Sequence, residues 1–263
     1  MNVGLVLSGG GARGVAHIGV LKALEEQNVE ITHIAGTSSG AVVGAFYAAG
    51  YTWSETFQFF KSLPIFHYRR YAHKKPGFID SIKFEKDFKK YFPKNSFEDL
   101  ERELFITGTN LNDGTSKIFN SGEIIKPLLA SASIPGVFTP IQINKDQYVD
   151  GGILNNFPVE PLIGLCDLII GVYVNPLDNL GRKFNYSYQV MSRAYQIAIG
   201  HQSKLKFKHC DLLVLPDGLI KYGVFSLNNL DEIFETGYMA AKTLLSEKAD
   251  ILKQYHESIV SSP

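Results

Sequence analysis

The run Gly36-Thr37-Ser38-Ser39-Gly40 places a serine between two glycines. It follows a short, mainly apolar run at 32–35 and precedes small residues typical of a helix at 41–45. A strand, a tight turn with serine at its apex and a helix make up the nucleophile-elbow pattern G-x-S-x-G. The glycines leave space beside the turn, and the helix N-terminus points free amides at any negative charge that forms there. Ser38 is therefore the expected nucleophile, with Gly36 and Gly40 supporting its turn.

A glycine-rich loop follows the first apolar run of the chain. Residues 4–8 are typical of a buried strand and lead into Gly9-Gly10-Gly11-Ala12-Arg13-Gly14, after which a helical pattern begins. Consecutive glycines between a strand and a helix let backbone N–H groups face outward together and bind an anion. We interpret Gly9, Gly10 and Gly11 as an oxyanion hole for Ser38, with Gly14 supporting the same loop.

The same loop also fits the dinucleotide fingerprint G-x-G-x-x-G. A dinucleotide site requires an acidic residue about 20 positions further on, at the end of the second strand. Here the second strand ends in Gly36-Thr37-Ser38, and the nearest acid, Glu30, precedes that strand. The oxyanion hole is therefore favoured over a nicotinamide site, and neither a cofactor nor a metal is expected.

A serine nucleophile needs a base, and none of the seven histidines lies in a small-residue turn after a late strand. His17, inside the first expected helix, is expected to pack there. Asp150 follows a short strand at 147–149 and precedes Gly151 and Gly152, so it is the expected acceptor of the serine proton. An Asp in this position also often caps its own turn. A Ser–Asp pair is expected to keep its activity below the pH range in which an imidazole protonates.

These three motifs occur in an order that resembles the patatin-like phospholipase family: Gly9-Gly10-Gly11-x-Arg13-Gly14, Gly36-x-Ser38-x-Gly40 and Asp150-Gly151-Gly152. The small-residue and proline stretch at 131–140 and the run Asn155-Asn156-x-Pro158 are similar to the family as well. The resemblance implies a Ser–Asp dyad of Ser38 and Asp150, with the Gly9–Gly11 amides as the oxyanion hole. It places Arg13 where the family has a basic residue, with a role in packing, loop bracing or substrate contact.

The resemblance further implies hydrolysis of ester bonds in (lyso)phospholipids or related fatty acyl esters. The alternative is a catalytically weak regulator of the same fold that binds lipid or a protein partner. A pure binding protein has no physical need for the serine, the aspartate and the glycine loop together, which favours the enzyme. Transient contact with a membrane surface is compatible with either function.

Composition favours a single α/β enzyme domain over residues 1–263. The chain is 45% hydrophobic and carries 26 basic and 26 acidic residues, so no overall field attracts nucleic acid. Cys166 and Cys210 stand alone, which indicates a reducing compartment. The first strand begins at Val3 and no apolar run is long enough to span a bilayer, so a cytoplasmic protein, at most peripheral to a membrane, is expected.

Strand and helix patterns alternate along the chain, which predicts a three-layer α/β/α fold with a mainly parallel sheet. Asn112-Asp113-Gly114 between two strand-like runs predicts one hairpin. Ser121 is expected to cap a helix that runs to about 132, with Pro127 delaying or kinking it. A late helix is expected over 186–208.

The segment 53–80 carries many aromatic residues followed by a basic cluster. One interpretation is a helical cap whose aromatics pack on the helix after Ser38 and whose charges are solvated. The other is a lid whose aromatics wall an acyl channel and whose cations meet lipid phosphates, with Gly77 as a hinge. The residues concerned are Trp53, Phe57, Phe59, Phe60, Ile65, Phe66, Tyr68, Tyr71, Arg69, Arg70, Lys74 and Lys75.

Overall fold

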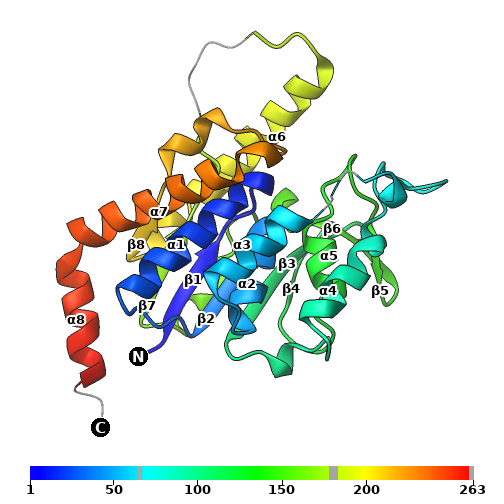
Figure 1. The fold of residues 1–263 in the computed structure, drawn as a ribbon. Helices are drawn as coiled ribbons and strands as arrows, with labels where there is room; N and C mark the ends of the chain where they lie inside the picture. Colours follow the sequence, from blue (N-terminus) through cyan, green and yellow to red (C-terminus); the bar gives the residue numbers. More distant parts are fainter. Residues whose placement is uncertain (64, 66, 178–182, 261–263) are drawn as a thin grey trace.

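The computed structural model describes residues 1–63, 65, 67–177 and 183–260. Its centre is one sheet with the strand order β5-β6-β3-β2-β1-β7-β8, and β4 pairs with β3 off this path (Figure 1). The strands are β1 (Val3–Leu7), β2 (His33–Thr37), β3 (Glu103–Asn110), β4 (Ser116–Phe119), β5 (Ile141–Ile143), β6 (Asp146–Asp150), β7 (Leu168–Val172) and β8 (Leu212–Val214).

The parallel part of the sheet runs from β3 through β2, β1 and β7 to β8. Every residue of β1 and β7 is buried, as expected for strands covered on both faces. The register pairs Leu7 of β1 with Gly36 of β2, so the residues that follow these two strands emerge side by side. The α/β class with a mainly parallel sheet is therefore confirmed.

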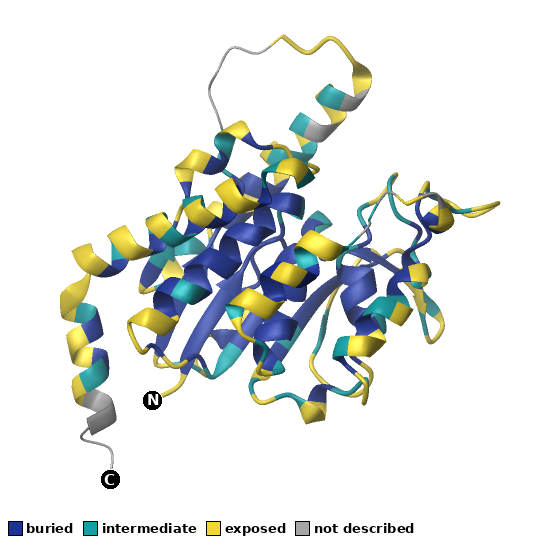
Figure 2. Cartoon of the chain, viewed as in Figure 1, coloured by how far each residue is buried: buried dark blue, intermediate teal, exposed yellow. Residues whose placement is uncertain are grey.

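Helices cover the face of the sheet that Figure 1 turns toward the viewer, and Figure 2 shows most of the central strands as buried. The other face is covered by a smaller apolar cluster around Phe157 and Leu162, with Phe207 packed against it. The α-helices are α1 (Val15–Glu26), α2 (Ser39–Ala48), α3 (Trp53–Ser62), α4 (Glu85–Tyr91), α5 (Ile125–Ser131), α6 (Ser187–Lys204), α7 (Leu230–Glu247) and α8 (Ala249–Val260). Among the described residues, no helix is long and apolar enough to cross a membrane.

The antiparallel part of the sheet is larger than the single predicted hairpin. The hairpin of β3 and β4 is present, and β6 also pairs antiparallel with β3 and with the short strand β5. The prediction that Ser121 caps a helix was wrong, since α5 begins at Ile125. The amide of Ile125 instead donates to Oδ1 of Asn95 at 2.9 Å. Pro127 lies in the first turn of α5, where a missing N–H costs no helical hydrogen bond.

The aromatic side chains of α3 belong to the core. Phe57 stacks on Phe234 of α7 at 4.9 Å between ring centroids, and Phe59 packs on Phe46 of α2 at 4.5 Å. These rings are buried and do not line an open channel, so the packing interpretation is confirmed for them. Phe66 lies outside the described residues, and motion of 53–80 as a lid stays a prediction.

Two cations of the basic cluster in this segment already have acidic partners within the chain. Nη2 of Arg70 lies 2.8 Å from Oδ2 of Asp87, and Nζ of Lys75 lies 2.7 Å from Oδ2 of Asp80. The guanidinium of Arg70 also stacks over the ring of Phe84. The contacts of Arg70 tie the segment to α4 and to the turn before it, whereas the Lys75 pair lies within the segment. The expectation that the charges of the cap are solvated was wrong for Arg70, which is buried.

Candidate active site

Ser38 lies at the turn between β2 and α2 and has φ 54° and ψ −126°. A non-glycine residue in such a conformation costs about 1–3 kcal/mol, and it persists only where the surroundings hold it. Its N–H donates to the hydroxyl of Ser131 at 2.9 Å, and its carbonyl accepts from the amide of Val42 at 3.1 Å. The strained turn, fixed on both sides, presents the Ser38 side chain at the carboxyl end of the sheet.

The glycines around the elbow are required by close backbone contacts. A Cβ on Gly36 would lie 2.7 Å from the backbone of Ala41, and one on Gly40 would lie 2.6 Å from the carbonyl of Ser8. A Cβ on Gly14 would overlap the side chain of Ser39. These residues therefore let the start of α2 rest directly on β1 and on the glycine loop.

Asp150 ends β6, and only 3% of its surface is exposed. The register aligns Thr37 of β2 with Thr107 of β3, and Gly108 of β3 with Asp150, so Ser38 and Asp150 approach from strands separated only by β3. Burial raises the pKa of Asp150 to about 6. Hydrogen bonds from the Ser38 hydroxyl and the Gly152 amide lower this pKa, but their effect is smaller than that of burial. The carboxylate is therefore within hydrogen-bonding reach of the expected nucleophile.

Asp150 is held in place through its side chain and its backbone. Its Oδ1 accepts the amide of Gly152 at 2.7 Å, which is the turn-capping bond foreseen for an Asp before two glycines. Its own N–H donates to the carbonyl of Ser133 at 2.9 Å. A Cβ on Gly151 would overlap the backbone of Thr107, so the turn after Asp150 packs tightly on β3. The turn-capping contact and the contact with Ser38 occur together.

The raised pKa of Asp150 changes one expectation from the sequence. An ordinary carboxylate would stay ionised well below pH 6, which would separate a Ser–Asp pair from a Ser–His pair in a pH profile. With a pKa of about 6, Asp150 protonates in the same range as an imidazole. The loss of activity at acid pH therefore does not distinguish a Ser–Asp pair from a Ser–His pair. Substitution of Asp150 and of the histidines must distinguish them.

The glycine loop lies against Ser38, since a Cβ on Gly9 would be 3.1 Å from Cβ of Ser38. The amide of Gly9 donates to the carbonyl of Asn156 at 3.2 Å, and the amide of Ala12 donates to the carbonyl of Val224 at 2.8 Å. Between them, the amides of Gly10 and Gly11 have no acceptor among the residues that the structure describes. Gly9 thus helps to fix the loop, and Gly10 and Gly11 are the donors left for an anion.

Arg13 and Asn175 brace this loop from behind. Nη2 of Arg13 donates to Oδ1 of Asn175 at 2.6 Å, and Nδ2 of Asn175 donates to the carbonyl of Gly9. Burial lowers the pKa of Arg13 to about 10, and its Nε has no partner in the described part of the chain. The contacts of Arg13 are those of loop bracing, one of the roles considered from the sequence.

Sequence reasoning assigned no function to Asn175, Ser131 or Tyr195. The signal for Asn175 was a polar residue directly after the apolar run at 167–174, and Ser131 opened the small-residue stretch of the family motif. Tyr195 of α6 carried no signal beyond helical spacing. Its hydroxyl lies 2.9 Å from where a Cβ on Gly152 would stand, and burial, followed by the charge of Asp150, raises its pKa.

The histidine closest to the loop in sequence is structural. His17 is fully buried, and its Nε2 lies 2.8 Å from the carbonyl of Ser8. Burial lowers its pKa to about 4, so the ring is neutral at ordinary pH and supports the strand end before Gly9. The prediction that His17 packs in the first helix is confirmed.

The three motifs, brought to one edge of the sheet, fall within a single family match. The model of patatin-like phospholipases matches residues 5–163. The chain belongs to the patatin-like phospholipase family. Among curated proteins, lysophospholipase nte1 of Aspergillus fumigatus has a similar sequence. It is 29% identical over 93% of this chain and 18% of that protein.

Two further curated proteins match different shares of this chain. Lysophospholipase NTE1 of Candida glabrata is 33% identical over 67% of this chain and 11% of that protein, and an NTE family protein of Mycobacterium bovis is 26% identical over 96% of this chain and 48% of that protein. The chain therefore spans less than half the length of these curated relatives. The crystal structure of VipD from Legionella pneumophila has the same fold, with a TM-score of 0.62 at 15% identity over 94% of this chain and 67% of VipD.

Proposed function

We propose that this chain is a serine acyl hydrolase that cleaves ester bonds of lysophospholipids, phospholipids or related fatty acyl esters. The observation that carries the proposal is the strained Ser38, whose hydroxyl meets the buried carboxylate of Asp150. The curated relatives named lysophospholipase support the choice of substrate class.

The first half of the reaction forms an acyl-enzyme. Asp150 accepts the Ser38 proton as Oγ of Ser38 attacks the ester carbonyl carbon. The oxyanion that forms is stabilised by the amides of Gly10 and Gly11, joined by the amide of Ser39 at the start of α2. The tetrahedral intermediate then releases the alcohol, which takes the proton back from Asp150.

The second half returns the enzyme to its starting state. Asp150 takes a proton from a water molecule, whose oxygen attacks the acyl-Ser38 carbonyl, and Ser38 recovers a proton as the fatty acid leaves. The burial that raises the pKa of Asp150 to about 6 makes it a stronger base than an ordinary carboxylate. It still ionises at neutral pH, so one group serves both steps.

The test compares wild type, Ser38→Ala and Ser39→Ala on p-nitrophenyl esters and lysophospholipids, with a fluorophosphonate probe for the nucleophile. Ser39 is the matched control because it is the adjacent serine, and its buried Oγ has no partner among the described residues. We expect Ser38→Ala to lose labelling and turnover, and Ser39→Ala to keep both. Hydrolysis by neither the wild type nor Ser39→Ala would favour the binding regulator over the enzyme.

A further inference from the structure

The helix α6 exposes an apolar face that the fold does not use. At 100° per residue, the exposed apolar positions fall within an arc of about 120° on one side of the helix. Met191 is 72% exposed, Val190 52% and Ile197 50%. We define the α6 face as these residues together with the exposed Ala194, Ala198 and Leu205.

The opposite side of α6 contacts the body of the protein. Ile199 and Ser203 are buried there, and Tyr195 brings its hydroxyl next to Gly152 in the turn after Asp150. The helix thus stands with one side on the active site and its apolar side in solvent, at the top of the view in Figure 1. Contiguous exposed apolar residues of this kind mark an interaction surface.

The charged side chains of the segment that carries the α6 face are all basic, and one of them, Lys206, pairs with Glu160. Residues 183–210 contain five Lys or Arg and no Asp or Glu, in a chain whose acidic and basic residues are equal in number. Lys204 is exposed and flanks the α6 face, and Lys183 and Lys208 are exposed beyond the two ends of the helix. Phe184, 48% exposed, adds an aromatic ring beside Lys183.

From this face and its charge, we propose that α6 docks the protein on an anionic phospholipid bilayer and brings the active site to the lipid surface. An amphipathic helix with apolar residues on one side and cations around them lies in the plane of a bilayer interface. Anionic lipid headgroups attract the surrounding Lys and Arg. This inference rests on the proposed function, because it names the physical form in which the ester substrate is met.

The charge pattern also selects between occupants of the α6 face. A second copy of the chain packed on the same face by a two-fold axis would bring like charges together, with no acidic residue in 183–210 to offset them. Nucleic acid would meet cations at the centre of its site, whereas the centre here is apolar. A bilayer with anionic headgroups fits both the apolar centre and the basic surround.

Docking through α6 would shorten the path of a lipid to Ser38. The α6 face enters the boundary between headgroups and acyl chains, and the other side of the same helix contacts the turn that holds Asp150. A lipid ester near the surface then lies close to the catalytic groups. The aromatics of α3 offer no such surface, because they pack on α2 and α7.

The test measures binding to vesicles in a Ser38→Ala background, so that lipid is not consumed and binding does not depend on catalysis. The vesicles are phosphatidylcholine alone, or phosphatidylcholine with about a third phosphatidylglycerol, at about 0.1 M and about 0.5 M salt. We expect flotation with the anionic vesicles, weaker by about tenfold with the neutral ones or at high salt. Absence of flotation with anionic vesicles would overturn the proposal and leave the proposed hydrolase intact.

The matched variants are Met191→Glu, in the α6 face, and Met239→Glu, a 50% exposed methionine of α7 outside it. Met191→Glu is expected to weaken vesicle binding at least about tenfold, and Met239→Glu to leave it unchanged. With an intact Ser38, both variants should hydrolyse a monomeric ester within about twofold of wild type, and Met191→Glu alone should lose activity on vesicle lipid.

Three results would count against the proposal. The first is wild-type vesicle binding by Met191→Glu at an unchanged melting temperature, and the second is equal weakening of binding by Met239→Glu. The third is a wild-type dimer that Met191→Glu dissociates, which would identify the α6 face as a contact between copies. If the wild type does not hydrolyse the monomeric ester, the proposed function is contradicted. Flotation with vesicles would still test membrane binding through the α6 face.

Discussion

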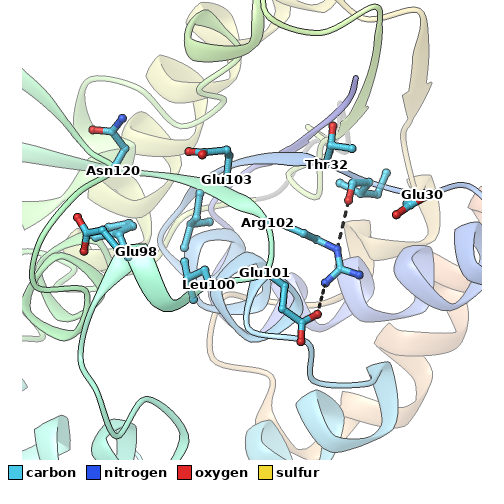
Figure 3. Close-up of a pocket in the computed structure, with 11 residues that line it drawn as sticks. Glu30, Thr32, Glu98, Leu100, Glu101, Arg102, Glu103 and Asn120 are labelled. Atoms are coloured by element: carbon cyan, nitrogen blue, oxygen red, sulfur yellow. Dashed lines mark hydrogen bonds and ion pairs between the residues drawn. The ribbon is translucent and has the colours of Figure 1, made fainter. Parts of the chain in front are cut away.

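Both ends of the parallel strands hold an arginine among polar groups, and the two arginines are bound differently. Arg102 lies at the amino end of β3, beside a pocket of about 420 Å³ (Figure 3). It donates to the carbonyls of Ile31 and Tyr47 and pairs with Glu101. Arg13 lies at the carboxyl end with one bond to Asn175 and a buried Nε that no described residue accepts.

The same contrast extends to the groups around each arginine. At the carboxyl end, Ser38 is strained, Asp150 has a raised pKa and two amides of the glycine loop lack acceptors among the described residues. At the amino end, the contacts of Arg102 are ordinary bonds to carbonyls and to a neighbouring carboxylate. Stored strain and unmet hydrogen-bonding capacity occur where charge must change during a reaction. On the proposed function, the amino end serves stability, and the carboxyl end gives up stability for chemistry.

Asp150→Asn is expected to have the largest effect on activity. Asn fills the same volume and can keep the contact with the Gly152 amide, but it cannot accept the Ser38 proton. We expect kcat to fall at least about a thousandfold, the scale for a lost general base. The measurement is ester hydrolysis with fluorophosphonate labelling in parallel. A histidine variant that is equally inactive, yet folded by circular dichroism, would show that the Ser–Asp pair is wrong.

The same variant should be more stable than wild type above pH 6. The folded pKa of Asp150 is raised to about 6 from 3.8, so ionisation destabilises the fold as pH rises from about 4 through 6. Asn removes that cost, and the free energy of unfolding at pH 8 should increase by about 2–3 kcal/mol. Urea unfolding at pH 8 and at pH 4 checks the sign, because the gain should fade toward pH 4. A loss of stability at pH 8 would contradict the cost assigned to the buried carboxylate.

Gly10→Ala is expected to lower kcat by about a hundredfold, the scale for one oxyanion donor. The new Cβ would lie 2.5 Å from Cγ2 of Val174, so the loop must move and its amides lose their alignment. The control is Gly10→Ala combined with Val174→Ala, which makes room for the methyl group and should restore part of the rate. Full activity of Gly10→Ala at an unchanged melting temperature would remove the oxyanion role.

Arg13→Met should act through the loop alone. Met keeps most of the apolar bulk but breaks the chain of bonds from Arg13 through Asn175 to the carbonyl of Gly9. We expect kcat to fall by about tenfold with KM little changed, because the loop amides act mainly on the transition state. The melting temperature should change little, since a buried guanidinium without a carboxylate partner contributes little net stability. A rise in KM at constant kcat would assign Arg13 to substrate contact instead.

The elements that short-range patterns specify were predictable from the sequence. Gly36-x-Ser38-x-Gly40 and the glycine loop each lie between a strand and a helix within a few residues, so the local residue pattern located both. The parallel pairing of β1 and β2 followed from the helix between them. The three-residue strand β5 was too short to leave a pattern, and it exists because β6 offers it an edge.

Features set by distant contacts were not predictable. The Ser131 hydroxyl meets the Ser38 amide across 93 residues, and Asn175 meets Arg13 across 162. The raised pKa of Asp150 depends on burial, which no local pattern states. Periodicity gave the extent of the helix near 186–208 without telling which side of it meets the core. The fold is what turns its apolar side outward and the aromatics of α3 inward.

Arg102→Met is expected to leave catalysis unchanged and to lower stability, the reverse of Arg13→Met. Its two bonds to the carbonyls of Ile31 and Tyr47, at 3.2 and 3.0 Å, link the strand entry to the end of α2. Their loss should cost about 1–2 kcal/mol in the free energy of unfolding, since the side chain is partly exposed and water replaces some of the contact. Parallel urea unfolding and ester hydrolysis on the two Met variants make the comparison directly. If Arg102→Met lost activity as Arg13→Met does, or if Arg13→Met lost stability as Arg102→Met does, the division of labour between the two ends of the sheet would not hold.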